Sequence, residues 1–285
     1  MDKVFINGKI LPREKAVISP FDRGFSYGDG VFETIGVFSG VPFLLEKHLQ
    51  RLFLGLQLLE IKLPYSKEQL ILKIGEYLNE NKVVNGVLKI IVSRGIGERG
   101  LLPAKDLEPT VLMSLSPLPP REFKPIKTSF LSVPVLPPKL VIGQIKTLNQ
   151  LPQVLAAKEC QKKGIVEGIR LTVEGYLAEG SMANLFWVKN GVLKTPEKNL
   201  VLPGIARELI LELARVAGIP VSEGKYPAEE ILGATEIFFT NSVRGIIPVG
   251  QFDQREFHDY SVTNRLWALY EAYLEKYILE NGSEE

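Results

Sequence analysis

Prolines gather near the middle of this 285-residue chain, at Pro117, Pro119, Pro120 and Pro125. Proline lacks a backbone N–H and has a fixed φ, so such a cluster interrupts both helices and the hydrogen-bond ladders of sheets. Residues on both sides of the cluster have patterns typical of strands and helices. We therefore expect an interdomain linker at 119–127, between a smaller N-terminal α/β domain at 1–118 and a larger C-terminal domain at 128–285.

Local patterns predict the elements of both domains. Asn7-Gly8 between two apolar runs indicates a β-hairpin, and Ser66 is the expected N-cap of a helix. Further strands are expected at 31–38, 41–44, 87–92 and 110–115. Helices are expected at 46–59, 66–81, 151–163, 205–217 and 260–279. Because strands and helices are mixed rather than strictly alternating, the expected fold class is α+β.

The composition excludes several classes of protein. Hydrophobic residues make up 45% and charged residues 24%, which is ordinary for a globular protein, and the net charge of +1 favours neither nucleic acid nor a membrane surface as partner. No apolar run approaches the roughly 20 residues of a membrane helix, and no signal-peptide core follows Met1. The single cysteine, Cys160, excludes an intramolecular disulfide. We expect a cytoplasmic protein that acts on small molecules.

Lys146 and Glu179 are the residues that most strongly suggest a chemistry. Lys146 ends the β-prone run 141–145 and is followed by a helix from Leu151. A lysine at a strand end can bind an aldehyde cofactor covalently, and an acid elsewhere can keep a pyridine nitrogen protonated. Pyridoxal phosphate (PLP) chemistry requires both groups. A single lysine is usually a solvated surface residue, so the segments around it decide between these interpretations.

Separated motifs along most of the chain identify a family. They are Asp22-Arg23-Gly24, Tyr27-Gly28-Asp29-Gly30-Val31-Phe32-Glu33-Thr34, His48-Leu49-Gln50-Arg51-Leu52, Ala178-Glu179-Gly180-Ser181 and Thr240-Asn241-Ser242. In this order they resemble the class IV PLP enzymes, which comprise branched-chain aminotransferases, D-amino-acid aminotransferases and aminodeoxychorismate lyases. The resemblance implies an enzyme of fold type IV, similar to D-amino-acid aminotransferase, with a PLP cleft between two domains and a homodimeric assembly.

The same resemblance assigns the groups that hold the cofactor. Lys146 is the catalytic residue, which carries PLP and later acts as a general base, and Glu179 pairs with the pyridine nitrogen. Arg51 matches the phosphate-binding arginine, although from the residues alone it is as consistent with a solvated surface arginine.

Two turns complete the expected phosphate site. The backbone amides of Ile205 and Ala206 open a helix, where the positive end of the helix dipole favours an anion. Many relatives carry Thr at the position of Ala206, so only the backbone contact carries over. The second turn offers the Ser242 hydroxyl and Val243; without the resemblance it is an ordinary loop.

The segment 94–101 is the expected substrate loop. Gly95, Gly97 and Gly100 spell a dinucleotide-binding pattern, but Leu101-Leu102-Pro103 cannot continue as the helix that this motif needs. By resemblance Arg99 binds a substrate carboxylate on a glycine-hinged loop. The alternatives are an exposed loop, or a carboxylate bound by Arg94 or Arg244.

Tyr27, Phe32 and Thr34 are expected to line the substrate site, or to be core residues of a strand. His48 and His258 lack the spacing of metal ligands, so no metal is expected.

Among the subfamilies, aminodeoxychorismate lyase is the closest match, which implies formation of 4-aminobenzoate and pyruvate on the way to folate. D-amino-acid aminotransferases typically have Arg-x-His where this chain has Arg99 followed by Gly100-Leu101. Branched-chain aminotransferases differ at Leu151, at Thr34 and at the turn 241–243. A non-enzymatic PLP-binding protein is the remaining alternative. The sequence does not separate lyase from transaminase activity, nor does it fix the substrate's stereochemistry.

Overall fold

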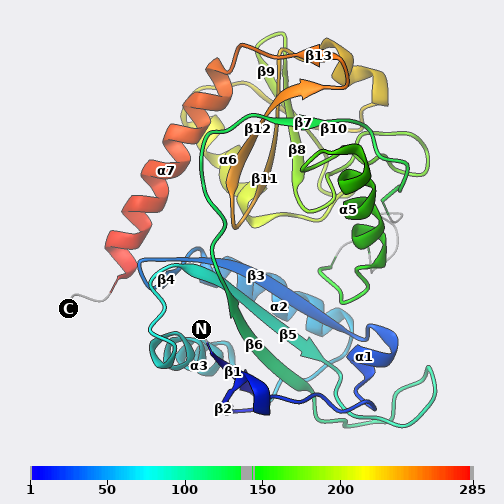
Figure 1. Ribbon diagram of the computed structural model, residues 1–285, viewed down its shortest axis with the longest axis vertical. Coiled ribbons are helices and arrows are strands. Elements are labelled where there is room, and N and C mark those ends of the chain that lie inside the picture. The colour runs from blue at the N-terminus through cyan, green and yellow to red at the C-terminus, as the bar shows by residue number, and fades with distance from the viewer. Residues whose placement is uncertain (1, 136–142, 144, 283–285) are drawn as a thin grey trace. The chain divides into compact units, whose positions relative to one another are not determined.

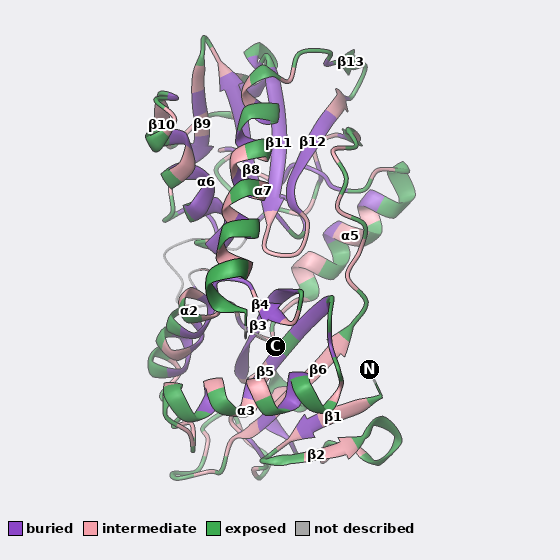
Figure 2. Ribbon diagram, turned by 90° about the vertical axis from the view of Figure 1, so that its left-hand side faces the viewer, coloured by how far each residue is buried: buried purple, intermediate pink, exposed green. Residues whose placement is uncertain are grey.

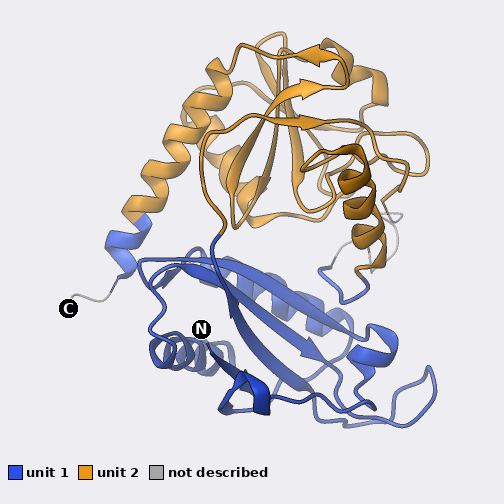
Figure 3. Ribbon diagram, in the orientation of Figure 1, with its two compact units in different colours: residues 1–118, 145–149, 277–285 blue, residues 119–144, 150–276 orange. Residues whose placement is uncertain are grey.

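The computed structural model describes residues 2–135, 143 and 145–282, which form two compact units (Figure 3). Unit 1 comprises 1–118, 145–149 and 277–285, and unit 2 comprises 119–144 and 150–276. The segment 145–149, which we placed in the C-terminal domain, thus groups with unit 1. Of the β-prone run before Lys146, residues 141, 142 and 144 lie outside the described part of the chain.

Unit 1 is built on an antiparallel sheet with the strand order β2-β1-β6-β5-β3-β4 (Figure 1). The strands are β1 Lys3–Ile6, β2 Lys9–Pro12, β3 Gly30–Phe38, β4 Val41–Pro42, β5 Gly86–Ser93 and β6 Thr110–Ser116. Asn7 and Gly8 have φ values of 46° and 86°, the left-handed region that a two-residue hairpin turn requires. The predicted hairpin and the predicted strands of this unit are confirmed.

The helices of unit 1 are α1 Arg23–Tyr27, α2 Leu45–Leu58 and α3 Lys67–Glu80. The apolar side chains of α2 and α3 share one core with the sheet; examples are Leu49, Leu52 and Ile74. Ser66 caps α3 as predicted, because its hydroxyl accepts a hydrogen bond from the Gln69 amide while the Gln69 side chain accepts one from the Ser66 amide.

The segment 145–149 extends the sheet of unit 1 beside the start of β3. The Phe32 amide donates to the Lys146 carbonyl oxygen at 2.9 Å, and the Leu148 amide donates to Gly30 at 3.0 Å. An isolated antiparallel bridge joins Val31 to Thr147. The backbone of Lys146 is therefore fixed by β3, although the two are distant in sequence.

Unit 2 contains a second sheet, with the order β10-β9-β8-β11-β12-β13 and with β7 beside β12. Its strands are β7 Ile126–Thr128, β8 Asn184–Lys189, β9 Val192–Pro196, β10 Val221–Gly224, β11 Glu236–Asn241, β12 Gly245–Phe252 and β13 Arg255–Glu256. The pairs β9–β10 and β7–β12 are parallel, and the others are antiparallel. The central strands β8 and β11 are buried almost throughout (Figure 2).

The helices of unit 2 are α5 Leu151–Lys163, α6 Ile205–Val216 and α7 Ser261–Asn281, of which α7 belongs to this unit as far as Lys276. Gly164 ends α5 with a φ of 66°, a left-handed conformation that glycine adopts without strain. All three helices were predicted to within about two residues at each end. Both units combine helices with largely antiparallel sheets, so the expected α+β class is confirmed.

Candidate active site

The Lys146 amine lies over an aromatic ring of unit 1. Its Nζ is 4.3 Å from the centroid of the Phe32 ring, and Lys89 Nζ lies 5.0 Å from the same centroid. Lys89 pairs in register with Thr34, which shares the face of β3 that carries Phe32. Phe32 and Thr34, both expected to contact substrate, are therefore on the side of the sheet where the Lys146 amine lies.

Arg51 is held by a buried carboxylate. Its Nε and Nη2 donate to the two oxygens of Glu33 at 2.7 and 2.8 Å, and the Nδ1 of His48 lies 2.7 Å from Glu33 Oε2. The side chains of Glu33 and His48 are 0% exposed and that of Arg51 is 10% exposed. Arg51 is thus not the solvated surface residue that was its alternative interpretation.

The charges of this cluster are arranged to keep Glu33 ionised. Burial opposes ionisation, but the charge of Arg51 and the hydrogen bonds from Arg51 and His48 outweigh it and lower the pKa of Glu33 to about 2. Burial lowers the pKa of His48, and the positive charges of Arg51 and Lys146 act in the same direction against the opposing effect of Glu33. His48 is therefore neutral at pH 7 and donates from Nδ1 to Glu33.

In unit 2, a network of backbone contacts holds the Glu179 carboxylate. Its Oε2 accepts a hydrogen bond from the Leu202 amide at 3.0 Å, and its carbonyl oxygen accepts one from the Arg170 amide at 2.8 Å. Glu179 also forms an antiparallel bridge with Asn184. The residue is half-buried, whereas an acid beside a turn is usually exposed.

The turn that follows Glu179 is fixed by a second acid, Glu167. This buried carboxylate accepts hydrogen bonds from the amide and hydroxyl of Ser181 and from the Met182 amide. A Cβ on Gly180 would come within 2.7 Å of Glu167 Oε1, so glycine is needed there for the carboxylate to approach the backbone. The position of Glu179 thus depends on a rigid turn.

The start of α6 is suited to an anion. Ile205 and Ala206 occupy its first two positions, and the N-cap, Gly204, contributes no side-chain hydrogen bond. A Cβ on Gly204 would clash with Asn184 Oδ1, so a side chain is excluded there. An α-helix of this length has amide groups at its N-terminus without partners inside the helix, and these bind phosphate well.

The second expected phosphate turn connects β11 to β12. The amides of Val243 and Arg244 both donate to Asn241 Oδ1, at 3.1 and 2.9 Å. Ser242 is half-buried at the tip of this turn, and the buried hydroxyl of Thr240 has no hydrogen-bond partner in the described part of the chain. The turn therefore offers hydroxyl groups, while the Val243 amide is engaged within the turn itself.

The loop that carries Arg99 is fastened to α1. The Arg23 guanidinium donates to the carbonyl oxygens of Gly100 and Leu101, both at 2.8 Å, and lies over the Tyr27 ring. The Tyr27 hydroxyl accepts a hydrogen bond from the Gly100 amide at 3.1 Å. Arg99 itself is exposed. The loop is therefore anchored on both sides of Gly100.

Arg94, an alternative carboxylate ligand, is engaged in structural contacts. It donates to both oxygens of Asp29 and to the carbonyl oxygens of Leu59 and Glu60. These contacts make Arg99 the better candidate of the two for binding a substrate.

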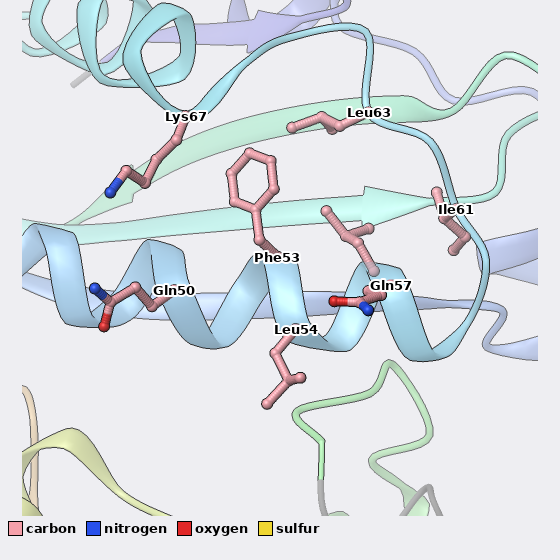
Figure 4. A pocket seen from close by; sticks show the side chains of 8 residues that line it. Gln50, Phe53, Leu54, Gln57, Ile61, Leu63 and Lys67 are labelled. Carbon is pink, nitrogen blue, oxygen red and sulfur yellow. The ribbon is translucent and has the colours of Figure 1, made fainter.

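A groove of about 530 Å³ lies beside α2 in unit 1 (Figure 4). Its lining residues are Gln50, Phe53, Leu54, Leu56, Gln57, Ile61, Leu63 and Lys67. Figure 4 shows Phe53 pointing toward Leu63 and Lys67. None of the predicted site residues lines it, so this groove is distinct from the candidate site.

Two further searches concern metals and membranes. Among the described residues, no three His, Cys, Asp or Glu side chains are grouped as a metal site would need. Within the same part of the chain, no helix has the length and apolar character required to span a membrane.

Several residues that shape the site were not found from sequence. Glu33 is a charged residue among the inward-facing apolar positions of β3, and His48 and Arg51 lie three positions apart on one face of α2. That pattern was a usable signal for a buried ion pair. Glu167 and Arg23 gave no comparable signal, because their partners are backbone groups distant in sequence.

Comparison with known proteins gives a consistent family. Residues 30–252 match the family described as amino-transferase class IV. The chain is 36% identical, over 91% of both chains, to a provisionally named branched-chain-amino-acid aminotransferase of Methanocaldococcus jannaschii. It is 33% identical to an aminodeoxychorismate lyase of Bacillus subtilis, over 98% of this chain and 97% of the relative. Identity to a D-alanine aminotransferase of Staphylococcus epidermidis is 30%, over 97% and 99%.

Solved structures show the same fold. The 4-amino-4-deoxychorismate lyase of Pseudomonas aeruginosa superimposes with a TM-score of 0.85 at 32% identity, covering 95% of this chain and 99% of the other. A branched-chain amino acid aminotransferase of a T.th. strain, complexed with N-(5'-phosphopyridoxyl)-L-glutamate, gives a TM-score of 0.88 at 26% identity, covering 98% and 95%.

Proposed function

Because this chain belongs to the class IV aminotransferase family, whose members are PLP-dependent enzymes, we propose that it is an aminodeoxychorismate lyase that forms 4-aminobenzoate and pyruvate. Similarity to lyases over nearly the whole chain supports this assignment. It is also supported by Leu151, Thr34 and the turn 241–243, where the sequence departs from the branched-chain pattern.

The donor groups of both units fit PLP. Unit 1 supplies an amine at Lys146 and a guanidinium at Arg51, and unit 2 supplies the Glu179 carboxylate. Unit 2 also supplies the side-chain-free start of α6 at Gly204 and a buried, unpartnered hydroxyl at Thr240, as far as the described residues show. An amine for the aldehyde, an acid for the pyridine nitrogen and several phosphate donors are the set that this cofactor needs.

In this proposal each residue has one task. When bound, PLP supplies an electron sink for the electron pair left by bond breaking at the substrate's Cα. Lys146 binds the cofactor's aldehyde carbon through its amine, and once released it removes and returns protons at the substrate. Glu179 holds the proton on the pyridine nitrogen. Arg51 and the amides of Ile205 and Ala206 bind the phosphate.

Transamination is the second candidate, and the names of the Methanocaldococcus and Staphylococcus relatives favour it. The same amine and acid serve both reactions. A transaminase additionally releases a keto acid, binds a second one and returns the amino group to it. The two reactions therefore differ in the products that accumulate rather than in these residues.

Product analysis with purified enzyme separates the candidates. We expect 4-aminobenzoate and pyruvate from aminodeoxychorismate, with kcat/KM on the order of 100-fold above that for D-alanine, L-leucine or L-valine with 2-oxoglutarate. Lys146→Ala should be inactive in every assay. A higher kcat/KM for one of the transamination pairs would overturn the lyase assignment and identify the transaminase.

The covalent attachment is tested independently of substrate. Borohydride reduction followed by peptide mapping should place the cofactor on Lys146. Attachment to any other lysine would contradict the site.

A further inference from the structure

Glu33 is a charged residue in an apolar environment. On β3 it stands between Val31 and Ile35, which belong to the core formed with α2, and its side chain is 0% exposed. An apolar residue of similar size would fill this position without the cost of burying a charge. The carboxylate therefore calls for an explanation beyond packing.

The explanation lies in what Glu33 does to Arg51. Its two oxygens accept parallel hydrogen bonds from Nε and Nη2, at 2.7 and 2.8 Å. A two-point contact fixes the rotation and tilt of the planar guanidinium, which one hydrogen bond does not. Nη1 lies on the opposite edge of the guanidinium, so Glu33 determines the direction in which that group points.

His48 completes the support of the carboxylate. Its Nδ1 lies 2.7 Å from Glu33 Oε2, and an ionised carboxylate can only accept, so the ring must donate. Glu33 thus receives donors from both Arg51 and His48. With neutral His48, the negative Glu33 and the positive Arg51 balance, and the guanidinium cannot move without leaving a buried charge unpaired.

We propose that Glu33 is a positioning residue for a phosphate monoester: it acts through Arg51, whose guanidinium it holds in one orientation before the phosphate binds. This inference rests on the proposed phosphate-binding role of Arg51. It assigns Glu33 no contact with cofactor or substrate.

The decisive measurement compares PLP with pyridoxal, which lacks the phosphate. The apoenzyme of each variant is titrated with both compounds. In Glu33→Gln, the Kd for PLP should rise by about 10- to 100-fold, as expected for a weakened charge-assisted contact, while the Kd for pyridoxal should change by less than about twofold. A purely structural role would weaken the binding of both compounds equally.

A double-mutant cycle tests whether Glu33 acts through Arg51. In an Arg51→Ala background, adding Glu33→Gln should change the Kd for PLP by less than about twofold, because no guanidinium remains to be positioned. Independent losses in the double variant would overturn the inference.

A second variant keeps the test decisive if Glu33→Gln does not fold. Glu33→Asp retains the charge but is one methylene shorter, so it cannot form the same two-point contact. It should raise the ratio of the PLP Kd to the pyridoxal Kd by about fivefold or more. An unchanged ratio would overturn the proposal.

Asp29→Asn is the matched control. Asp29 also accepts two hydrogen bonds from one arginine, Arg94, and one from Arg23 in the same unit. Its replacement should leave the ratio of the two Kd values unchanged. A change as large as that of Glu33→Gln would show that any lost carboxylate–arginine pair has this effect.

The outcomes separate this inference from the proposed function. If Arg51→Ala leaves the ratio of the two Kd values unchanged, Arg51 does not bind the phosphate and that part of the proposed function fails. If Arg51→Ala raises the ratio but both Glu33 variants leave it unchanged, the phosphate role stands and the positioning role of Glu33 fails.

Discussion

Glu179 is the single residue whose neutral replacement should separate catalysis from cofactor binding. Glu179→Gln keeps the shape of the side chain and an acceptor for the Leu202 amide, but an amide cannot hold a proton on the pyridine nitrogen. We expect kcat to fall on the order of 100-fold, which corresponds to about 3 kcal/mol of transition-state stabilisation, with PLP still bound. Steady-state kinetics and the absorbance of bound PLP measure the two effects.

The exposed Glu229 of the same unit provides the control, since Glu229→Gln should leave kcat unchanged. An unaltered kcat in Glu179→Gln would mean that Glu179 serves only the turn.

His48 should make the stability of the protein depend on pH. Its pKa in the folded state lies below the ordinary value of 6.5, chiefly because the ring is buried. The unfolded chain then takes up the proton first, so stability is present above pH 6.5 and is lost as the pH falls below it. Between about pH 7.5 and about pH 5.5 this loss is at most about 1.4 kcal/mol.

Urea unfolding of the holoenzyme at both pH values measures this loss. His48→Asn, which keeps a donor but does not titrate, should lose less stability than the wild type over the interval. His258→Asn, at an exposed position, should behave like the wild type. Equal pH dependence in wild type and His48→Asn would show that His48 titrates normally.

At the scale of elements, the anchored loop makes a prediction about substrate binding. Arg23 and Tyr27 hold the backbone at Gly100, so the neighbouring Arg99 is presented from a fixed position rather than from a freely hinged loop. Arg99→Ala should raise KM for a carboxylate substrate by about 10- to 100-fold, and Arg99→Lys should recover only part of this loss.

Arg23→Gln should have a similar but smaller effect on KM, and it should add nothing in an Arg99→Ala background. Amine substrates without a carboxylate should be indifferent to all three variants. If KM for carboxylates stays flat in Arg99→Ala, the loop is only a surface connection, and Arg244 becomes the next candidate.

The sequence predicted those elements whose signals are local. The helix 66–81 was found from its capping residues and apolar spacing, and the first hairpin from Asn7-Gly8. α1 was missed because five residues are too few for a periodic pattern. Residues 145–149 were placed in the wrong unit because their pairing with β3 is a contact between distant parts of the chain, which no local pattern encodes.

At the scale of the whole molecule, the resemblance gave candidate residues but not their partners. Arg51 and Glu179 were chosen because they match family motifs, and nothing in those motifs states that Glu33 holds one and the Leu202 amide the other. Such contacts depend on how a strand faces a helix or a loop. Sequence alone therefore predicted the chemistry of the site better than its support.

The surface of unit 1 leads to a prediction about assembly. Large apolar side chains are exposed on two segments that Arg23 holds together, the segment around α1 and the loop after β5. They are Phe21, Phe25, Ile96, Leu101 and Leu102, and the last is 90% exposed. Apolar residues grouped in this way mark an interaction surface, and the family resemblance implies a homodimer.

Sedimentation at micromolar concentration should give about twice the chain mass of 31.8 kDa. Replacing Phe25 and Leu102 together by Asp should shift the protein toward the mass of a single chain, because charged side chains would be buried in the contact. Val216→Asp, at an 89% exposed position of unit 2, is the control and should remain dimeric. A wild-type protein that sediments as a monomer with full activity would contradict the assembly, and a double variant that stays dimeric would place the contact elsewhere.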